Sequence, residues 1–196
     1  LKVVLMNLIR DIIAFVVTLV PRFIIISEFE HGVKLVWGNY QKTLTSTNGI
    51  NGRGVHFWWP LATDIYEVNI RPQLRRIDCQ SVMTSDGRSV GVSGAIEYSV
   101  ADPSASILEV QDIDESLSHF AAGTITRYIN SRTLEHCREV DDLEKEILKG
   151  VRMRSKEWGL RIRRFFITDL VEHKAIRIMT GAAPADDWVP VSVEDE

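Results

Sequence analysis

The sequence predicts an α+β fold in which antiparallel strands come first and helices follow. Residues 90–100 alternate apolar side chains with small or polar ones, the period-2 pattern of a half-buried strand. Residues 113–128 place apolar side chains three and four positions apart, as one face of a helix does. Strand-like runs precede residue 103 and helical periodicity follows it, an order typical of α+β proteins.

The composition is that of a folded protein and argues against nucleic-acid binding. The chain has 196 residues, of which 45% are hydrophobic and 26% charged, and its net charge is −4. A nucleic-acid-binding protein would show a basic excess gathered on one face, and the basic residues here are spread along the chain. Cys79 and Cys137 are too few for a disulfide framework or a zinc site, and they fit a reducing compartment.

The first 22 residues form a segment that is unusually apolar for a soluble domain. Fourteen of the first 20 are large and apolar, and at about 100° per residue the polar Asn7, Arg10, Asp11 and Thr18 share one narrow stripe. The uncharged run between Asp11 and Arg22 is ten residues long. That run gives about 15 Å of helix, against a hydrocarbon core of about 30 Å.

We therefore expect residues 1–22 to form a helix or hairpin embedded in one leaflet, and a buried core helix is the alternative. Half-burial of the fourteen apolar side chains would gain on the order of 10 kcal/mol. The side chains expected to contact lipid in this segment are Leu5, Leu8, Ile9, Ile12, Ile13, Phe15, Val16, Val17, Leu19 and Val20.

Strand signals fill the next sixty residues. Residues 23–30 and 33–37 are rich in apolar and β-branched side chains, and 65–70 and 74–77 read as further strands. Residues 47–54 (TNGINGRG) are a glycine- and asparagine-rich loop for which we expect a hairpin connection. A phosphate-binding loop is excluded there, because no lysine followed by Ser or Thr comes after it.

An aromatic cluster lies at residues 55–61, in the stretch VHFWWPL. Rings with one polar edge favour the headgroup region of a membrane, so Phe57, Trp58 and Trp59 are candidate membrane contacts. A core cluster of the small sheet is the alternative. The two interpretations are compatible if Phe57 points inward and Trp58 or Trp59 points outward.

The second half of the chain carries clear start and stop signals. Residues 84–87 (TSDG) predict a turn, near which we place the boundary between two subdomains. Asp102-Pro103-Ser104 ends a strand and opens a helix, and Asp112 or Asp114 suits the N-cap of the next one. A further helix is expected from Leu143 to Trp158, with Gly159 as its left-handed cap. Residues 160–170 return to strand, and 171–179 read as a short final helix.

No catalytic or metal-binding constellation is visible. The five histidines have no ligand-like spacing, and the adjacent His136 and Cys137 would not face each other on a helix. The acids at 141–146 suit the positive end of a helix. We therefore expect no enzyme activity, no metal and no cofactor.

The basic run Arg161, Arg163 and Arg164 is a candidate contact for lipid headgroups or for an acidic region of a neighbouring subunit. On a regular strand Arg161 and Arg163 would share one face and Arg164 would point opposite. A plain solvated strand face is the alternative interpretation.

The order of these features resembles the SPFH (stomatin/prohibitin/flotillin), or band 7, family over about residues 23–181. The elements that carry the resemblance are 28–33 (EFEHGV), Gly38, 53–60 (RGVHFWWP), 68–71 (VNIR), 84–87 (TSDG), 98–103 (YSVADP), 158–160 (WGL) and 167–170 (ITDL). The family usually continues into a charged coiled coil, and residues 182–196 show no heptads.

The resemblance implies a membrane-bound scaffold that is not an enzyme. Such a protein would self-associate into rings or cages on one membrane face, organise lipid microdomains, and recruit partners such as membrane proteases or channels. We expect a membrane-embedded segment at 1–22, one SPFH subdomain at 23–85, a second at 86–181, and an acidic tail at 182–196. The rival interpretations are a soluble subunit of a vault-like shell and, with less support, a membrane-bound hydrolase.

Overall fold

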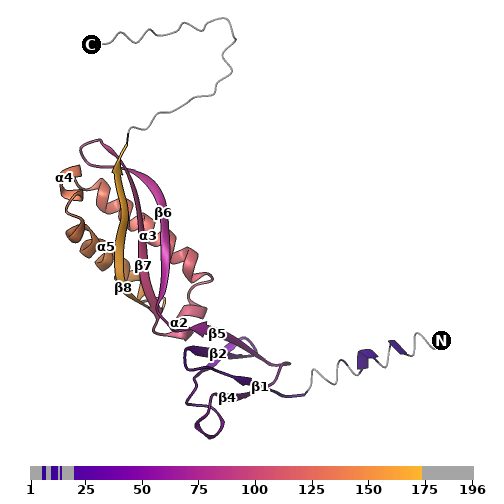
Figure 1. Cartoon of the computed structure of the whole chain (residues 1–196). Coiled ribbons are helices and arrows are strands. Elements are labelled where there is room, and N and C mark those ends of the chain that lie inside the picture. Colours follow the sequence, from indigo (N-terminus) through magenta and orange to yellow (C-terminus); the bar gives the residue numbers. More distant parts are fainter. Residues whose placement is uncertain (1–5, 8–9, 13, 15–19, 174–196) are drawn as a thin grey trace, which may run out of the picture.

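The computed structural model describes residues 6–7, 10–12, 14 and 20–173. Residues 20–173 form two lobes arranged end to end, which gives this part of the chain an elongated shape (Figure 1). We call residues 22–70 lobe 1 and residues 73–173 lobe 2. Antiparallel sheets and helices make up the two lobes, so the predicted α+β class is confirmed.

Lobe 1 consists of two small antiparallel sheets. Its five strands are β1 (Arg22–Ile25), β2 (Glu30–Val36), β3 (Asn39–Leu44), β4 (Val55–Trp58) and β5 (Thr63–Asn69), with the 3₁₀ helix η1 at Ile50–Gly52. Strand β1 pairs with β4, and the second sheet has the order β3-β2-β5. The loop at 47–54 therefore joins strands of different sheets, and the expected hairpin connection there is wrong. Strand β3 was missed because it is polar and mostly exposed.

The core of lobe 1 is small. Ile26, Val33 and Leu44 are its fully buried apolar side chains among the described residues. Ile26 and Leu44 pack tightly against Gly32, where a Cβ atom would lie 3.1 Å from the Ile26 side chain and 3.3 Å from Leu44. The buried His56 is held by a 2.8 Å hydrogen bond between its Nε2 and the carbonyl oxygen of Thr45. Few buried groups thus hold this lobe together.

Lobe 2 is built on one antiparallel sheet of long strands. These are β6 (Gln73–Met83), β7 (Ser89–Val100) and β8 (Leu160–Glu172), in the order β6-β7-β8. The turn predicted at 84–87 closes the β6–β7 hairpin, with Gly87 at a φ of 78°. The expected subdomain boundary at residue 85 thus falls inside this hairpin. Sheet pairing changes earlier, between Asn69 and Gln73.

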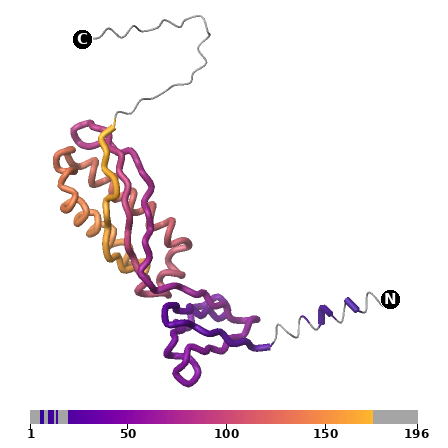
Figure 2. Tube along the Cα trace, viewed as in Figure 1, coloured from indigo at the N-terminus to yellow at the C-terminus, as the bar shows by residue number. Residues whose placement is uncertain are grey.

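Four helices accompany this sheet: α2 (Pro103–Leu108), α3 (Ile113–Asn130), α4 (Leu134–Cys137) and α5 (Val140–Ser155). Helices α3 and α5 lie against one face of the sheet (Figure 2). Asp102 caps α2 and Asp112 caps α3, each accepting hydrogen bonds from backbone N–H groups. Of the two N-cap candidates for α3, Asp112 and Asp114, Asp112 is the one that caps the helix. Strand β8 runs on to Glu172, so the start of the helix expected at 171–179 is wrong.

The core of lobe 2 is large and continuous. Val68 reaches it from lobe 1, so the two lobes are packed together at their junction. The buried members of the cluster are Val68, Ile77, Val82, Val92, Ile96, Tyr98, Val100, Leu117, Ala121, Ile125, Ile129, Cys137, Leu143, Ile147, Val151, Leu160, Ile162 and Phe165.

Side chains of α5 cover the outer edge of β8. The Arg152 guanidinium donates hydrogen bonds to the carbonyl oxygens of Ile162 and Arg163, each at 3.1 Å. Farther along the strand, the Ile167 N–H donates to the Glu144 carboxylate at 2.7 Å. These bonds satisfy backbone groups that would otherwise be open to another strand, so this edge is protected.

Candidate functional site

An exposed apolar face distinguishes the two-stranded sheet of lobe 1. In the antiparallel register Phe23 lies opposite Phe57 and Ile25 opposite Val55, so these four side chains share one face. Phe23, Ile25 and Phe57 are 65%, 72% and 50% exposed. The two phenylalanine rings meet edge to face, with centroids 5.7 Å apart. We call these four residues the apolar face.

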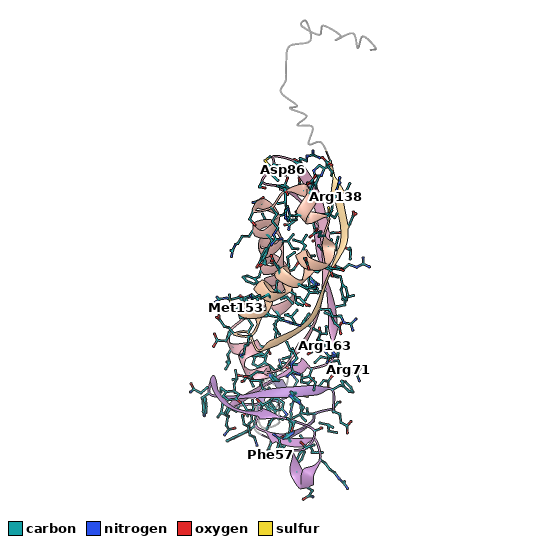
Figure 3. The ribbon with its side chains drawn as sticks, turned by 90° about the vertical axis from the view of Figure 1, so that its left-hand side faces the viewer. Phe57, Arg71, Asp86, Arg138, Met153 and Arg163 are labelled. Atoms are coloured by element: carbon teal, nitrogen blue, oxygen red, sulfur yellow. The ribbon has the colours of Figure 1, made fainter. Side chains whose placement is uncertain are left out.

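The orientation expected for the aromatic cluster is wrong for Phe57. The opposite face of the sheet carries the buried His56 and the half-buried Ile24 and Trp58, and it packs toward the lobe. Since successive residues of a strand alternate, burial of His56 turns Phe57 outward. Trp59, beyond the end of the strand, is exposed as expected. Figure 3 shows Phe57 in lobe 1, far from the labelled residues of lobe 2.

Trp37 is an exposed aromatic residue that the sequence analysis missed. It forms the turn between β2 and β3 with Gly38, has a φ of 51°, and is 75% exposed. A left-handed conformation costs a residue with a side chain roughly 1–2 kcal/mol, so a tryptophan there is an outlier that suggests a functional role. The available signal was a bulky aromatic residue beside glycine in a two-residue turn.

Trp37 lies at the end of lobe 1 where the N-terminal segment joins. The backbone N–H of Trp37 donates a 2.9 Å hydrogen bond to the carbonyl oxygen of Ala62, which is near the exposed Trp59 and Leu61 in the chain. At this same end of β4, Trp58 is paired with Arg22, the first residue of β1. We call Trp37, Trp59 and Leu61 the aromatic end.

The predicted membrane segment lies mostly outside the described residues. Ile12 and Val20 are described, and both are exposed. In the part of the chain that the structure describes, no helix has the length and apolar character needed to cross a membrane. The remaining expected contacts, all outside the described residues, are Leu5, Leu8, Ile9, Ile13, Phe15, Val16, Val17 and Leu19.

A basic hollow lies in lobe 2, between α5 and the start of β8. Four cations line it: Arg152 of α5, Lys156 at the C-cap of that helix, and Arg161 and Arg163 of the strand. The apolar lining is Ala101, Leu160 and Ile162, and the volume is about 660 Å³. None of the lining residues is acidic. We call this cavity the basic hollow.

A β-bulge changes the arrangement expected for the arginines. The register of β7 with β8 shifts between Glu97 and Tyr98, and Arg163 is the extra residue. Arg161 and Arg164 consequently lie opposite Ser99 and Glu97, which share one face of β7. The expectation that Arg164 points away from Arg161 is therefore wrong, whereas Arg161 and Arg163 both line the basic hollow.

The structure brings together a serine and a histidine that are far apart in sequence. Ser81 Oγ and His173 Nε2 are 3.0 Å apart, across the outer face of the sheet and above Gly91. Among the described residues, no carboxylate bonds the other ring nitrogen, as a catalytic triad would require. The hydrogen bond between Ser81 and His173 therefore has a structural role, because it connects β6 to the end of β8.

The remaining candidate groups have structural partners. His136 Nδ1 is hydrogen-bonded to Thr133 Oγ1 at 3.1 Å. The Cys137 side chain is buried, and this burial raises the pKa of its thiol, which makes it a poor nucleophile. Across the described residues, no cluster of three or more His, Cys, Asp or Glu side chains is placed to hold a metal ion.

The two lobes, with small antiparallel sheets in one and a helix-covered sheet in the other, define an SPFH-type domain. The family model described as "SPFH domain / Band 7 family" matches residues 24–181. The chain belongs to this family, as the sequence resemblance indicated.

Curated relatives carry names from the same family. A stomatin homologue of Pyrococcus abyssi is 24% identical over 161 residues, which cover 80% of this chain and 59% of that protein. Stomatin-4 of Caenorhabditis elegans is 21% identical over 147 residues, or 74% of this chain and 50% of its own length. A putative band 7 family protein of Acanthamoeba polyphaga mimivirus is 27% identical over 119 residues, covering 60% of this chain and 39% of the relative. The matched region is thus only part of each of these relatives.

Proposed function

We propose that this protein is a membrane-associated scaffold that is not an enzyme. It self-associates on one face of a membrane, organises lipids there, and recruits membrane proteins such as proteases or channels. The observation that supports this function best is the apolar face of lobe 1, in a strand that directly follows the apolar N-terminal segment. Membership of the SPFH family supports it independently.

The apolar face and the aromatic end are proposed to lie against lipid. Phe23, Ile25, Trp37 and Phe57 are each half exposed or more. Transfer of each side chain out of water gains roughly 1 kcal/mol when about half of its surface is buried. A few kcal/mol alone gives reversible binding, so the N-terminal segment is the main anchor and lobe 1 sets the orientation of the domain.

Tryptophan quenching by brominated lipid tests this proposal, because bromine on the acyl chains quenches indoles that reach the interface. We expect vesicles of brominated phosphatidylcholine to quench the bound protein. Replacing Trp37→Tyr together with Trp59→Tyr should remove much of the quenchable emission. The matched control is Trp158→Tyr, because Trp158 packs within lobe 2, where its ring centroid lies 5.8 Å from that of Phe120.

Two results would contradict the proposal. Equal loss of quenchable emission in the Trp158 control and in the double variant would show that lobe 1 does not face the lipid. Failure of the wild-type protein to bind vesicles at all would remove the membrane role itself.

A further inference from the structure

We propose that the basic hollow of one copy binds the acidic segment 182–196 of a neighbouring copy. The inference deepens the proposed self-association and rests on it. The occupant is specific: the sequence DDWVPV at 186–191, in which two carboxylates precede a tryptophan.

The hollow has cations without ionic partners. Among the described residues, no ion pair involves Arg152, Lys156, Arg161 or Arg163, although neighbouring Arg154 pairs with Glu157. Four cations around one cavity repel each other, and an anionic ligand relieves that repulsion. Two of them are arginines of β8, whose planar guanidinium groups suit carboxylates.

The acidic segment complements the hollow in charge. It carries five carboxylate side chains, at residues 186, 187 and 194–196, and no basic residue. The net charge of the whole chain is only −4, so residues 1–181 are net positive. The hollow also offers an apolar lining of Ala101, Leu160 and Ile162, which suits the indole of Trp188 beside its two acids.

Geometry favours a neighbouring copy over the same chain. His173 lies at the far end of lobe 2, because its N–H bonds the Ser89 carbonyl and Arg88 nearby pairs with Asp86. Figure 3 shows Asp86 at that far end and Arg163 near lobe 1. The eleven strand residues from Ile162 to Glu172 span about 35 Å.

Asp186 follows His173 by thirteen residues, which reach at most about 45 Å when fully extended. A copy would therefore have to stretch its segment almost straight to fill its own hollow. A neighbouring copy has no such restriction. A contact between two different surfaces of identical copies can repeat from one copy to the next. The repeated contact forms a ring when the last copy meets the first.

Charge reversal in the full-length protein tests the contact. The hollow variant is Arg161→Glu with Arg163→Glu, which leaves Arg152 in place because it covers the β8 edge. The segment variant is Asp186→Lys with Asp187→Lys. The matched control is Arg76→Glu with Lys149→Glu, which makes the same charge change at exposed positions outside the hollow.

Sedimentation velocity of the detergent-solubilised protein measures self-association. Each of the two test variants should weaken association about tenfold or more, since two attractive charge pairs become repulsive, and the control should leave it unchanged. An equimolar mixture of the two variants should recover assembly. In that mixture the normal segment of one variant meets the normal hollow of the other, and the two reversed surfaces also match.

The outcomes separate this inference from the proposed function. Recovery only when all four substitutions are in one chain would place the segment in its own hollow and overturn the contact between copies. Unchanged assembly in the hollow variant would also overturn it, and reduced binding to anionic vesicles would then identify lipid as the occupant. A wild-type protein that stays monomeric in membranes would instead overturn the proposed self-association.

Discussion

The two lobes differ in how much of their apolar surface they bury. Lobe 2 covers one face of its sheet with α3 and α5 and contributes seventeen of the eighteen buried residues of the main cluster. Lobe 1 fully buries Ile26, Val33 and Leu44 among the described residues, while three apolar side chains of β1 and β4 are at least half exposed. Lobe 2 therefore has the core of an independently stable domain.

Lobe 1 by contrast depends on its surroundings. Sheets of two and three strands without a large core are marginally stable in water. Val68 and the contacts of α2 with β2 and β3 attach this lobe to lobe 2. The proposed lipid contact would bury the remaining apolar face. The difference indicates that lobe 2 supplies stability and that lobe 1 uses its apolar residues for binding.

A Phe→Ala substitution should change the free energy of unfolding far more in lobe 2 than in lobe 1, and this is the largest difference expected between the lobes. Phe165, which is 3% exposed, fills the core of lobe 2, and Phe165→Ala should lower the free energy of unfolding by about 3–5 kcal/mol. Phe57→Ala on the apolar face should lower it by about 1 kcal/mol or less. Circular dichroism of the detergent-solubilised protein during heating measures both. Equal shifts of the unfolding temperature would show that lobe 1 has a core of its own.

A smaller effect is expected at the helix that connects the lobes. Asp102 accepts a 2.6 Å hydrogen bond from the Ser104 hydroxyl and others from backbone N–H groups, and these bonds lower the pKa of its carboxyl below the usual 3.8. Because the folded pKa is the lower one, the stabilisation is present above pH 3.8 and is lost as the pH falls through the folded pKa. Loss of this cap should loosen α2 and its contacts with lobe 1.

Substitution of Asp102 measures that contribution. Asp102→Ala should cost about 1 kcal/mol at neutral pH, and Asp102→Asn, which still caps the helix, should cost less. The unfolding temperature of the Asn variant should also depend less on pH between about 5 and 3. Protection of the β2 and β3 amides in hydrogen exchange reports whether lobe 1 loosens. If both variants kept the wild-type dependence of unfolding temperature on pH, the capping role of the Asp102 carboxylate would be contradicted.

Local patterns predicted much of lobe 2 but little of how its elements combine. The alternation in β7 and the periodicity of α3 are properties of neighbouring residues, and the sequence alone indicated them, as it indicated an N-cap at Asp112 or Asp114. Strand β3 carries no apolar pattern, and the bulge at Arg163 depends on pairing with β7. The basic hollow likewise joins α5 to β8 through tertiary packing, so the sequence indicated only its strand arginines.

The outer face of the lobe 2 sheet should contribute least to stability. Ser81→Ala removes the hydrogen bond to His173, which lies at an exposed site, and should lower the free energy of unfolding by about 0.5 kcal/mol or less. The same pair offers a test for hydrolase chemistry. A serine hydroxyl without an oriented base is a weak nucleophile, so a fluorophosphonate probe should not label Ser81. Labelling that disappears in Ser81→Ala would contradict the proposed non-enzymatic function and would favour a membrane-bound hydrolase.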